Sequence, residues 1–153
     1  MQNLNIETLK KIALAGLIGE IVFEAYSWLL SPVIFGPILE PAKLVTAVVA
    51  KVSGIMLPYS LAFIIHFLIG TIFFALLVYV ANGILRKGYV LAGLVTGLVL
   101  WFVAQGMLAP FIGRPFMMSF GAYTQSSFVA HTGMMIVIGL VLSKLLADQA
   151  AKA

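Results

Sequence analysis

Two glutamates, Glu20 and Glu24, lie inside an apolar stretch that is long enough to cross a membrane. The stretch covers residues 10–35, and the spacing of four residues places both carboxyl groups on one face of a helix. The same face includes Ser27 and Ser31. An ionisable side chain in hydrocarbon costs at least ~2.5–3.5 kcal/mol on insertion scales, so each carboxyl group needs a partner or a role. The pair is therefore a candidate site for carrying a proton or binding a cation.

Two histidines, His66 and His131, are the candidate partners of this pair, because both lie in other apolar stretches. Two neutral imidazoles on facing helices could be the axial ligands of a haem b. Together with Glu24 they could form a metal site of two histidines and one carboxylate. They could also form hydrogen bonds with the head group of a quinone. The candidate cofactors are therefore haem b, a quinone and a metal ion.

Each of these residues also has a structural interpretation. A protonated glutamate can form a hydrogen bond across two helices or pair with a partner subunit. A histidine within the membrane can bond a neighbouring carbonyl or hydroxyl group. Gln105, in a third apolar stretch, is the further polar side chain that we assign to the proton or ion site with Glu20 and Glu24.

The composition indicates an integral membrane protein. Hydrophobic residues make up 63% and charged residues 9% of the 153 residues, and the mean hydropathy is +1.15. A soluble domain contains roughly 25% charged residues. Four stretches reach the ~20 residues with which a helix spans a bilayer, namely residues 11–31, 58–82, 89–110 and 123–146. Their apolar runs are continuous rather than alternating, which favours helices over a β-barrel.

Several classes of function are excluded by the residues that the chain contains. There is no cysteine, so disulfides and thiolate metal sites are absent. The net charge of +4 comes mostly from loops and tails, and no basic patch with interleaved aromatic residues predicts a nucleic-acid partner. No phosphate-binding loop, nucleophile triad or zincin motif is present. These absences favour a protein that is not an enzyme, and they leave open an enzyme or electron carrier with a metal at Glu24, His66 and His131.

The distribution of positive charges predicts the orientation in the membrane. A four-span topology places most lysines and arginines on the side that carries both termini. By the positive-inside rule both termini are cytoplasmic in a bacterial inner membrane, where the chain is multi-pass. The residues on the cytoplasmic side are Lys10, Lys11, Arg86, Lys87, Lys144 and Lys152, and those on the outer side are Lys43, Lys51 and Arg114.

The first external connection contains a moderately apolar segment at residues 41–53. It carries Lys43 and Lys51 and is too short to span the bilayer. We expect a short helix that lies in the outer interface with its lysines turned to the headgroups. Docking onto a neighbouring subunit would explain the segment equally well.

Two pairs of short motifs predict an internal duplication. The pattern P-x-I-x-x-P occurs at residues 32–37 and again at residues 110–115. The pattern F-x-x-H occurs at residues 63–66 and at residues 128–131. Two parallel two-helix units would be related by a pseudo-twofold axis along the membrane normal. With a rise of 1.5 Å per residue, Glu24, Gln105 and both histidines would then lie at similar heights, in a polar pocket of the outer half.

The duplicated units resemble small bacterial inner-membrane proteins of the YagU-like kind. The resemblance depends on the F-x-x-H motifs and on the spacing of His66 and Gly70. The second unit departs from it, because Gly133 follows His131 by two residues rather than four. The resemblance implies an all-α fold of four membrane helices and an inner-membrane location, and it implies no activity.

Our leading hypothesis is therefore a single membrane domain, residues 1–153, that forms a four-helix bundle with a short outer interfacial helix. It would act as an accessory subunit of a larger inner-membrane assembly, of a respiratory or redox kind, with a pocket for a haem, a quinone or a proton path. The expected partners are the lipid bilayer and either larger subunits or a second copy. The alternative is a small dimeric transporter or channel, coupled to protons or cations through Glu20 and Glu24.

Overall fold

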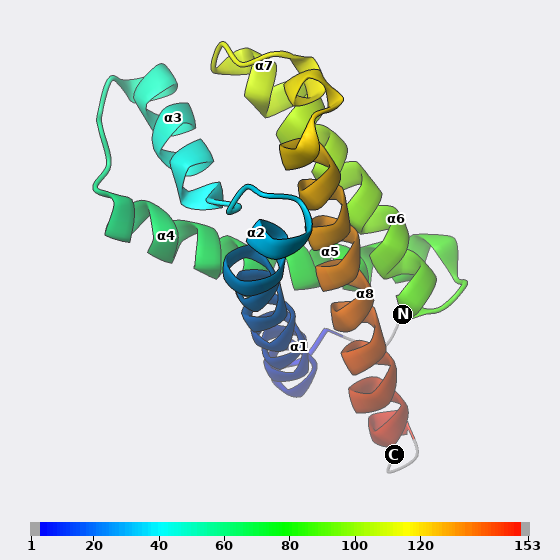
Figure 1. Cartoon of the computed structure of the whole chain (residues 1–153). Coiled ribbons are helices and arrows are strands. Elements are labelled where there is room, and N and C mark those ends of the chain that lie inside the picture. Colours follow the sequence, from blue (N-terminus) through cyan, green and yellow to red (C-terminus); the bar gives the residue numbers. More distant parts are fainter. Residues whose placement is uncertain (1–3, 151–153) are drawn as a thin grey trace.

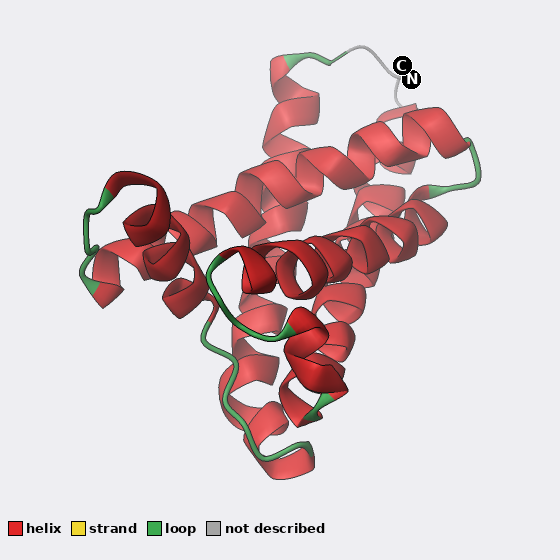
Figure 2. Cartoon of the chain, turned by 90° about the horizontal axis from the view of Figure 1, so that it is seen from above, coloured by secondary structure: helices red, strands yellow, loops and turns green. Residues whose placement is uncertain are grey.

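The described chain consists of helices and short loops. The computed structural model describes the backbone of residues 4–150 and the side chains of residues 4–147; Lys152, one of the charges that predict the orientation, lies outside the described residues. Residues 4–150 contain no strand. This confirms the expectation of an all-α protein (Figure 2).

Four helical spans are long and apolar enough to cross a membrane, which confirms the predicted number. They cover Ile6–Ile34, Tyr59–Leu85, Tyr89–Phe111 and Ala122–Ala147. Each overlaps one of the four predicted stretches, and the first begins several residues earlier than predicted. Between the first two spans lies the helix α3 (Pro41–Ser53), over the range where the sequence predicts a short helix. Its position relative to a bilayer stays a prediction.

The first three spans are each divided by a short π-helical segment. The first consists of α1 (Ile6–Ala25), η1 (Tyr26–Leu30) and α2 (Ser31–Ile34). The second consists of α4 (Tyr59–Leu68), η2 (Ile69–Phe74) and α5 (Ala75–Leu85). The third consists of α6 (Tyr89–Phe102), η3 (Val103–Leu108) and α7 (Ala109–Phe111). The fourth span belongs to α8 (Ala122–Ala150), which is continuous.

Prolines explain two of the π-helical segments. Pro32 and Pro110 have no N–H, and a proline ring within a helix displaces the carbonyl of the preceding turn. The N–H before each proline accordingly reaches back five residues, from Ser31 to the carbonyl of Tyr26 and from Ala109 to that of Ala104. These two bonds differ in position by 78 residues, which is also the offset between the two P-x-I-x-x-P motifs. Two duplicated units would produce such a match.

The helix α8 is the centre of the arrangement, since it packs along both α6 and α1 (Figure 1). Glycines permit the close approach. An added Cβ at Gly93 or Gly97 would collide with the α8 backbone, at Met135 and at His131–Thr132 respectively. The G-x-x-x-G motif of α6 therefore serves packing within the chain. The buried core around α8 includes Met134, Met135, Ile138, Leu142, Ile12, Ala15, Phe23, Val78 and Tyr79.

Large apolar side chains also cover much of the outer surface. Leu29, Ile64, Ile72 and Val99 are each more than half exposed. In a soluble protein such exposure would be costly, whereas in a bilayer these side chains meet lipid. The outer surface of the four helices therefore fits contact with lipid acyl chains.

Candidate functional site

Glu20, Glu24 and His66 form one polar cluster between the first two spans. A potential ligand atom of each residue lies within 4.8 Å of the others. The helix α1 brings the two carboxyl groups together because they are one turn apart, and α4 contributes the imidazole. Oε1 of Glu20 lies 3.1 Å from Nδ1 of His66. Glu20 is fully buried and His66 is 9% exposed.

The side chains around the cluster determine its shape. Gly70 follows His66 by one helical turn on the same span, and the Glu20 carboxylate occupies the space that a Cβ at Gly70 would need. The indole N–H of Trp28 donates a hydrogen bond of 2.9 Å to Oε2 of Glu24. The ring of Phe23 packs against the imidazole of His66, with centroids 5.7 Å apart. The cluster is thus held by one close helix contact and one directed hydrogen bond.

His131 belongs to a second polar group, between the third and fourth spans. Its Nδ1 lies 2.8 Å from the carbonyl oxygen of Ser127 and 3.3 Å from that residue's hydroxyl. The amide of Gln105 donates to the Ser127 hydroxyl at 3.1 Å. A carbonyl oxygen accepts hydrogen bonds and cannot donate them. Nδ1 of His131 therefore carries the proton, and in the neutral ring Nε2 remains an acceptor.

Phe23 contacts the histidine of both groups. Its ring centroid lies 5.7 Å from that of His131 as well as 5.7 Å from that of His66. The structure therefore brings Glu24 and His66 together with Glu20, whereas His131 of the predicted metal set lies in the other group. Gln105, which the sequence analysis assigned to the proton or ion site, also lies in the second group.

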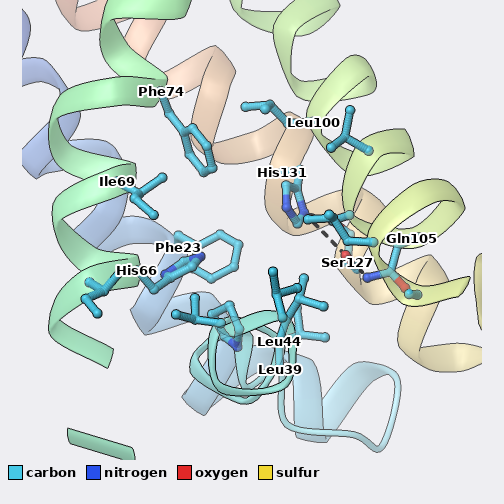
Figure 3. A pocket seen from close by; sticks show the side chains of 18 of the residues that line it. Phe23, Leu39, Leu44, His66, Ile69, Phe74, Leu100, Gln105, Ser127 and His131 are labelled. Atoms are coloured by element: carbon cyan, nitrogen blue, oxygen red, sulfur yellow. Dashed lines mark hydrogen bonds between the residues drawn. The ribbon is translucent and has the colours of Figure 1, made fainter. Parts of the chain in front are cut away.

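A cavity of about 480 Å³ adjoins both groups. Figure 3 shows His66 and Phe23 on one side of it and His131, Ser127 and Gln105 on the other. Most of the remaining lining is apolar, and it comes from the second, third and fourth spans, from α3 and from adjoining loops. The remaining lining residues are Leu39, Pro41, Leu44, Val45, Val48, Val49, Ile65, Ile69, Phe73, Phe74, Leu100, Val103, Ala104, Leu108, Ala109, Arg114 and Tyr123.

The helix α3 closes one side of the cavity with an apolar face. That face includes Val45 and Val48, whereas Lys43 and Lys51 are exposed. A hydrogen bond from Lys43 to Glu40 raises the pKa of the lysine above its ordinary value. The sequence predicts this two-sided character of the segment, but it gives no sign of the cavity beneath it.

Two of the contact residues, Ser127 and Phe23, were not predicted from the sequence. Ser127 precedes His131 by one helical turn, and this spacing could have indicated a hydrogen bond between them. Phe23 had no comparable signal, because an aromatic residue in a membrane helix is ordinary. Its contact with both histidines depends on how three helices are placed.

Comparison with family models, curated proteins and solved structures gave no match for this chain.

Proposed function

We propose that the chain is a small, non-enzymatic membrane subunit that binds a quinone in the cavity between His66 and His131. The observation that supports this is the combination of an apolar cavity with two histidines on its wall. Its volume, about 480 Å³, falls within the roughly 300–1,000 Å³ of small-molecule sites. Such sites are lined mainly by apolar side chains and use a few polar groups to orient the ligand.

The polar groups of the wall suit the two oxygens of a quinone or quinol. Nε2 of neutral His131 accepts a hydrogen bond, as a quinol hydroxyl would require. The amide of Gln105 donates one hydrogen bond to Ser127, and its second N–H suits a quinone carbonyl. The ring of the ligand would lie among apolar side chains such as Leu100 and Phe74.

A haem held by both histidines fits this geometry less well. Such a haem would need its flat ring between the two imidazoles, and the Phe23 ring packs against both of them. We therefore favour the quinone over haem b as the occupant.

The experiment begins with the protein purified from its native membrane in mild detergent. Solvent extraction and mass spectrometry should detect a bound quinone, and the absorption spectrum should lack a haem Soret band.

The second experiment measures the affinity of the purified protein for a short-chain quinone. The His131→Ala variant should bind it at least about 10-fold more weakly than the wild type, a loss of about 1.4 kcal/mol in binding free energy. Thr132→Ala is the matched control, because the Thr132 hydroxyl bonds its own helix at Phe128. Equal affinity of His131→Ala and wild type would refute the proposal.

The subunit would work within a larger assembly of the bacterial inner membrane, of a redox kind, with both termini cytoplasmic. The small size of the chain, its many exposed apolar side chains and the excess of positive charge on the terminal side support this part of the proposal. The proposed resemblance to YagU-like proteins would imply the same location. Stable copurification of larger membrane subunits from the native membrane is the expected result. Labelling of engineered terminal cysteines from the periplasm alone would contradict the orientation.

The second candidate function is transport coupled to protons or cations. The buried Glu20–Glu24–His66 cluster supports it, because ionisable side chains within a membrane often belong to ion pathways. The test is flux into liposomes that contain the purified protein. Proton- or cation-dependent uptake that is lost in Glu24→Gln would favour transport over quinone binding.

A further inference from the structure

We propose that Glu20, Glu24 and His66 bind a divalent transition-metal ion between the first two spans. Their potential ligand atoms lie within 4.8 Å of one another, which is close enough for one ion to contact all three after small side-chain movements. Two of these residues are fixed by one turn of α1, and the third comes from the neighbouring span. The set offers two oxygen ligands and one nitrogen ligand.

Four polar atoms of this cluster are buried without hydrogen bonds. Both oxygens of Glu20, Oε1 of Glu24 and Nδ1 of His66 have no hydrogen-bond partner, although the last lies at ion-pair distance from Glu20. The buried hydroxyl of Ser27, one turn beyond Glu24, is also without a partner. Buried polar groups are nearly always satisfied, and exceptions indicate an ion, a water or a functional role. An ion that contacts these atoms would satisfy the cluster.

The charges of the cluster favour a divalent ion. Two carboxylates carry two negative charges, so a divalent cation makes the site neutral, whereas a monovalent cation leaves one negative charge in a medium where charge is costly. Carboxylates alone would suit Mg²⁺ or Ca²⁺, but the imidazole of His66 favours ions such as Zn²⁺, Mn²⁺ or Co²⁺. Copper(I) is disfavoured because the three ligands include no sulfur.

Neighbouring residues support the three ligands. Trp28 holds one oxygen of Glu24 by a hydrogen bond and leaves the other oxygen for the ion. Gly70 leaves room for the Glu20 carboxylate, and Phe23 covers the imidazole of His66. Partners of this kind orient metal ligands and affect affinity. His131 is not a ligand here, since its Nδ1 bonds Ser127 in the other group.

The metal cluster and the quinone cavity share one residue. Among the described residues that line the cavity, His66 is the one that also belongs to the cluster, and Glu20 and Glu24 lie outside that lining. Metal binding can therefore be measured on the protein without any quinone. A failure of one proposal leaves the other intact.

The experiment uses the full-length protein in detergent after treatment with a chelator. Addition of Co²⁺ should produce visible absorption bands of a protein-bound ion that saturate near one ion per chain, and Zn²⁺ should displace them. Glu20→Gln, Glu24→Gln and His66→Gln should each weaken binding at least about 10-fold. Trp28→Phe, which removes only the supporting hydrogen bond, should weaken it by about 10-fold.

Two controls separate a specific site from general effects of substitution. His131→Gln changes the other buried histidine, and Glu40→Gln changes a carboxylate in a loop, so both should bind Co²⁺ as the wild type does. Zn²⁺ should raise the melting temperature of the wild type, and this shift provides a readout when a cluster variant folds poorly. The absence of Co²⁺ bands and of a Zn²⁺ shift in the wild type would overturn the proposal. Unchanged binding in Glu20→Gln and His66→Gln would overturn it as well.

Discussion

The carboxylate of Glu20 lies 3.1 Å from the imidazole of His66, and the two side chains come from different spans. Neither side chain is accessible enough for water to compensate its polar atoms, since Glu20 is fully buried and His66 is 9% exposed. Their contact is therefore one of the buried contacts that join the first span to the second. It also places a potential ligand set beside a cavity that both histidines line.

Gly70→Ala should disrupt this contact. A Cβ at Gly70 would collide with the Glu20 carboxylate, so the glutamate must move away from His66. We expect a net loss of up to about 2 kcal/mol in the free energy of unfolding, because overpacking a buried site costs about 1–3 kcal/mol and alanine recovers about 0.8–1 kcal/mol over glycine in a helix. We also expect weaker Co²⁺ binding. Thermal unfolding in detergent and Co²⁺ titration measure the two effects.

Gly133→Ala is the matched control for this prediction. Gly133 follows the other histidine, and a Cβ there would meet no atom within 4 Å. Alanine favours a helix over glycine by about 0.8–1 kcal/mol, so this variant should be at least as stable as the wild type. If the Gly70→Ala protein were as stable as the Gly133→Ala protein, the Glu20 carboxylate would lie elsewhere.

Ala104→Leu should fill part of the cavity without harming the fold. Ala104 lines the cavity, so a larger side chain can extend into free space. We expect little change in stability and at least about 10-fold weaker binding of a short-chain quinone, a change of about 1.4 kcal/mol. Isothermal titration calorimetry and thermal unfolding are the measurements.

Ala92→Leu enlarges another alanine of the third span for comparison. Ala92 is fully buried in the core and packs against other side chains, so the added atoms should cost about 1–3 kcal/mol. If both leucine variants were equally destabilised, the space beside Ala104 would not be a cavity.

Ser126→Ala should remove the centre of a polar network between the first and fourth spans. The Ser126 hydroxyl lies 2.6 Å from that of Ser31 and 3.0 Å from that of Tyr26. Without the Ser126 hydroxyl, the hydroxyl groups of Tyr26 and Ser31 lose a hydrogen-bond partner. Because these groups are partly or fully buried, the loss should lower the free energy of unfolding by about 1–3 kcal/mol. Thermal unfolding should therefore show a clear loss of stability.

Ser143→Ala is the comparison, because the Ser143 hydroxyl bonds only a carbonyl of its own helix, that of Gly139, among the interactions described. Its removal should change stability by less than about 0.5 kcal/mol. A loss as large as that of Ser126→Ala would mean that the network contributes nothing specific.

Ser119→Gly should stabilise the turn before α8. Ser119 is exposed and has a φ of 55° within η4 (Phe116–Phe120), where Met117, Met118 and Phe120 also have positive φ. A left-handed conformation costs an ordinary residue roughly 1–2 kcal/mol, which glycine does not incur. The melting temperature should rise.

Ser60→Gly is the control, because Ser60 is at an exposed helical position. This substitution should lower stability by about 0.5 kcal/mol. A lower melting temperature in both variants would contradict the left-handed turn.

The sequence predicts the membrane class and the four spans because both depend on local properties. A run of about 20 apolar residues has the length of a bilayer crossing whatever its neighbours are. The pairing of Glu20 with Glu24 is equally local, since residues one turn apart share a face of any α-helix. The two-sided character of residues 41–53 follows from the same periodicity.

The stripe of Glu20, Glu24, Ser27 and Ser31 shows where this local reasoning fails. Ser31 follows the π-helical segment η1 and bonds Ser126 of the fourth span, whereas the two glutamates meet His66 of the second. A π-helical turn contains an additional residue, which shifts the later faces by roughly 100°. A face that is extrapolated through such a segment therefore points in the wrong direction.

The sequence by itself determined which four stretches are long and apolar enough to cross a membrane, and it predicts their relative heights. The tertiary structure alone decided that His66 joins the glutamates, that His131 bonds Ser127, and that both histidines line one cavity. The physical reason is that the rise per residue fixes depth along a helix, while the rotation of each helix about its axis depends on packing against the others. Close contacts at Gly70 and Gly97 constrain that rotation, because the Glu20 carboxylate approaches Gly70 and the backbone of α8 approaches Gly97. The sequence pattern does not show which groups will approach these glycines.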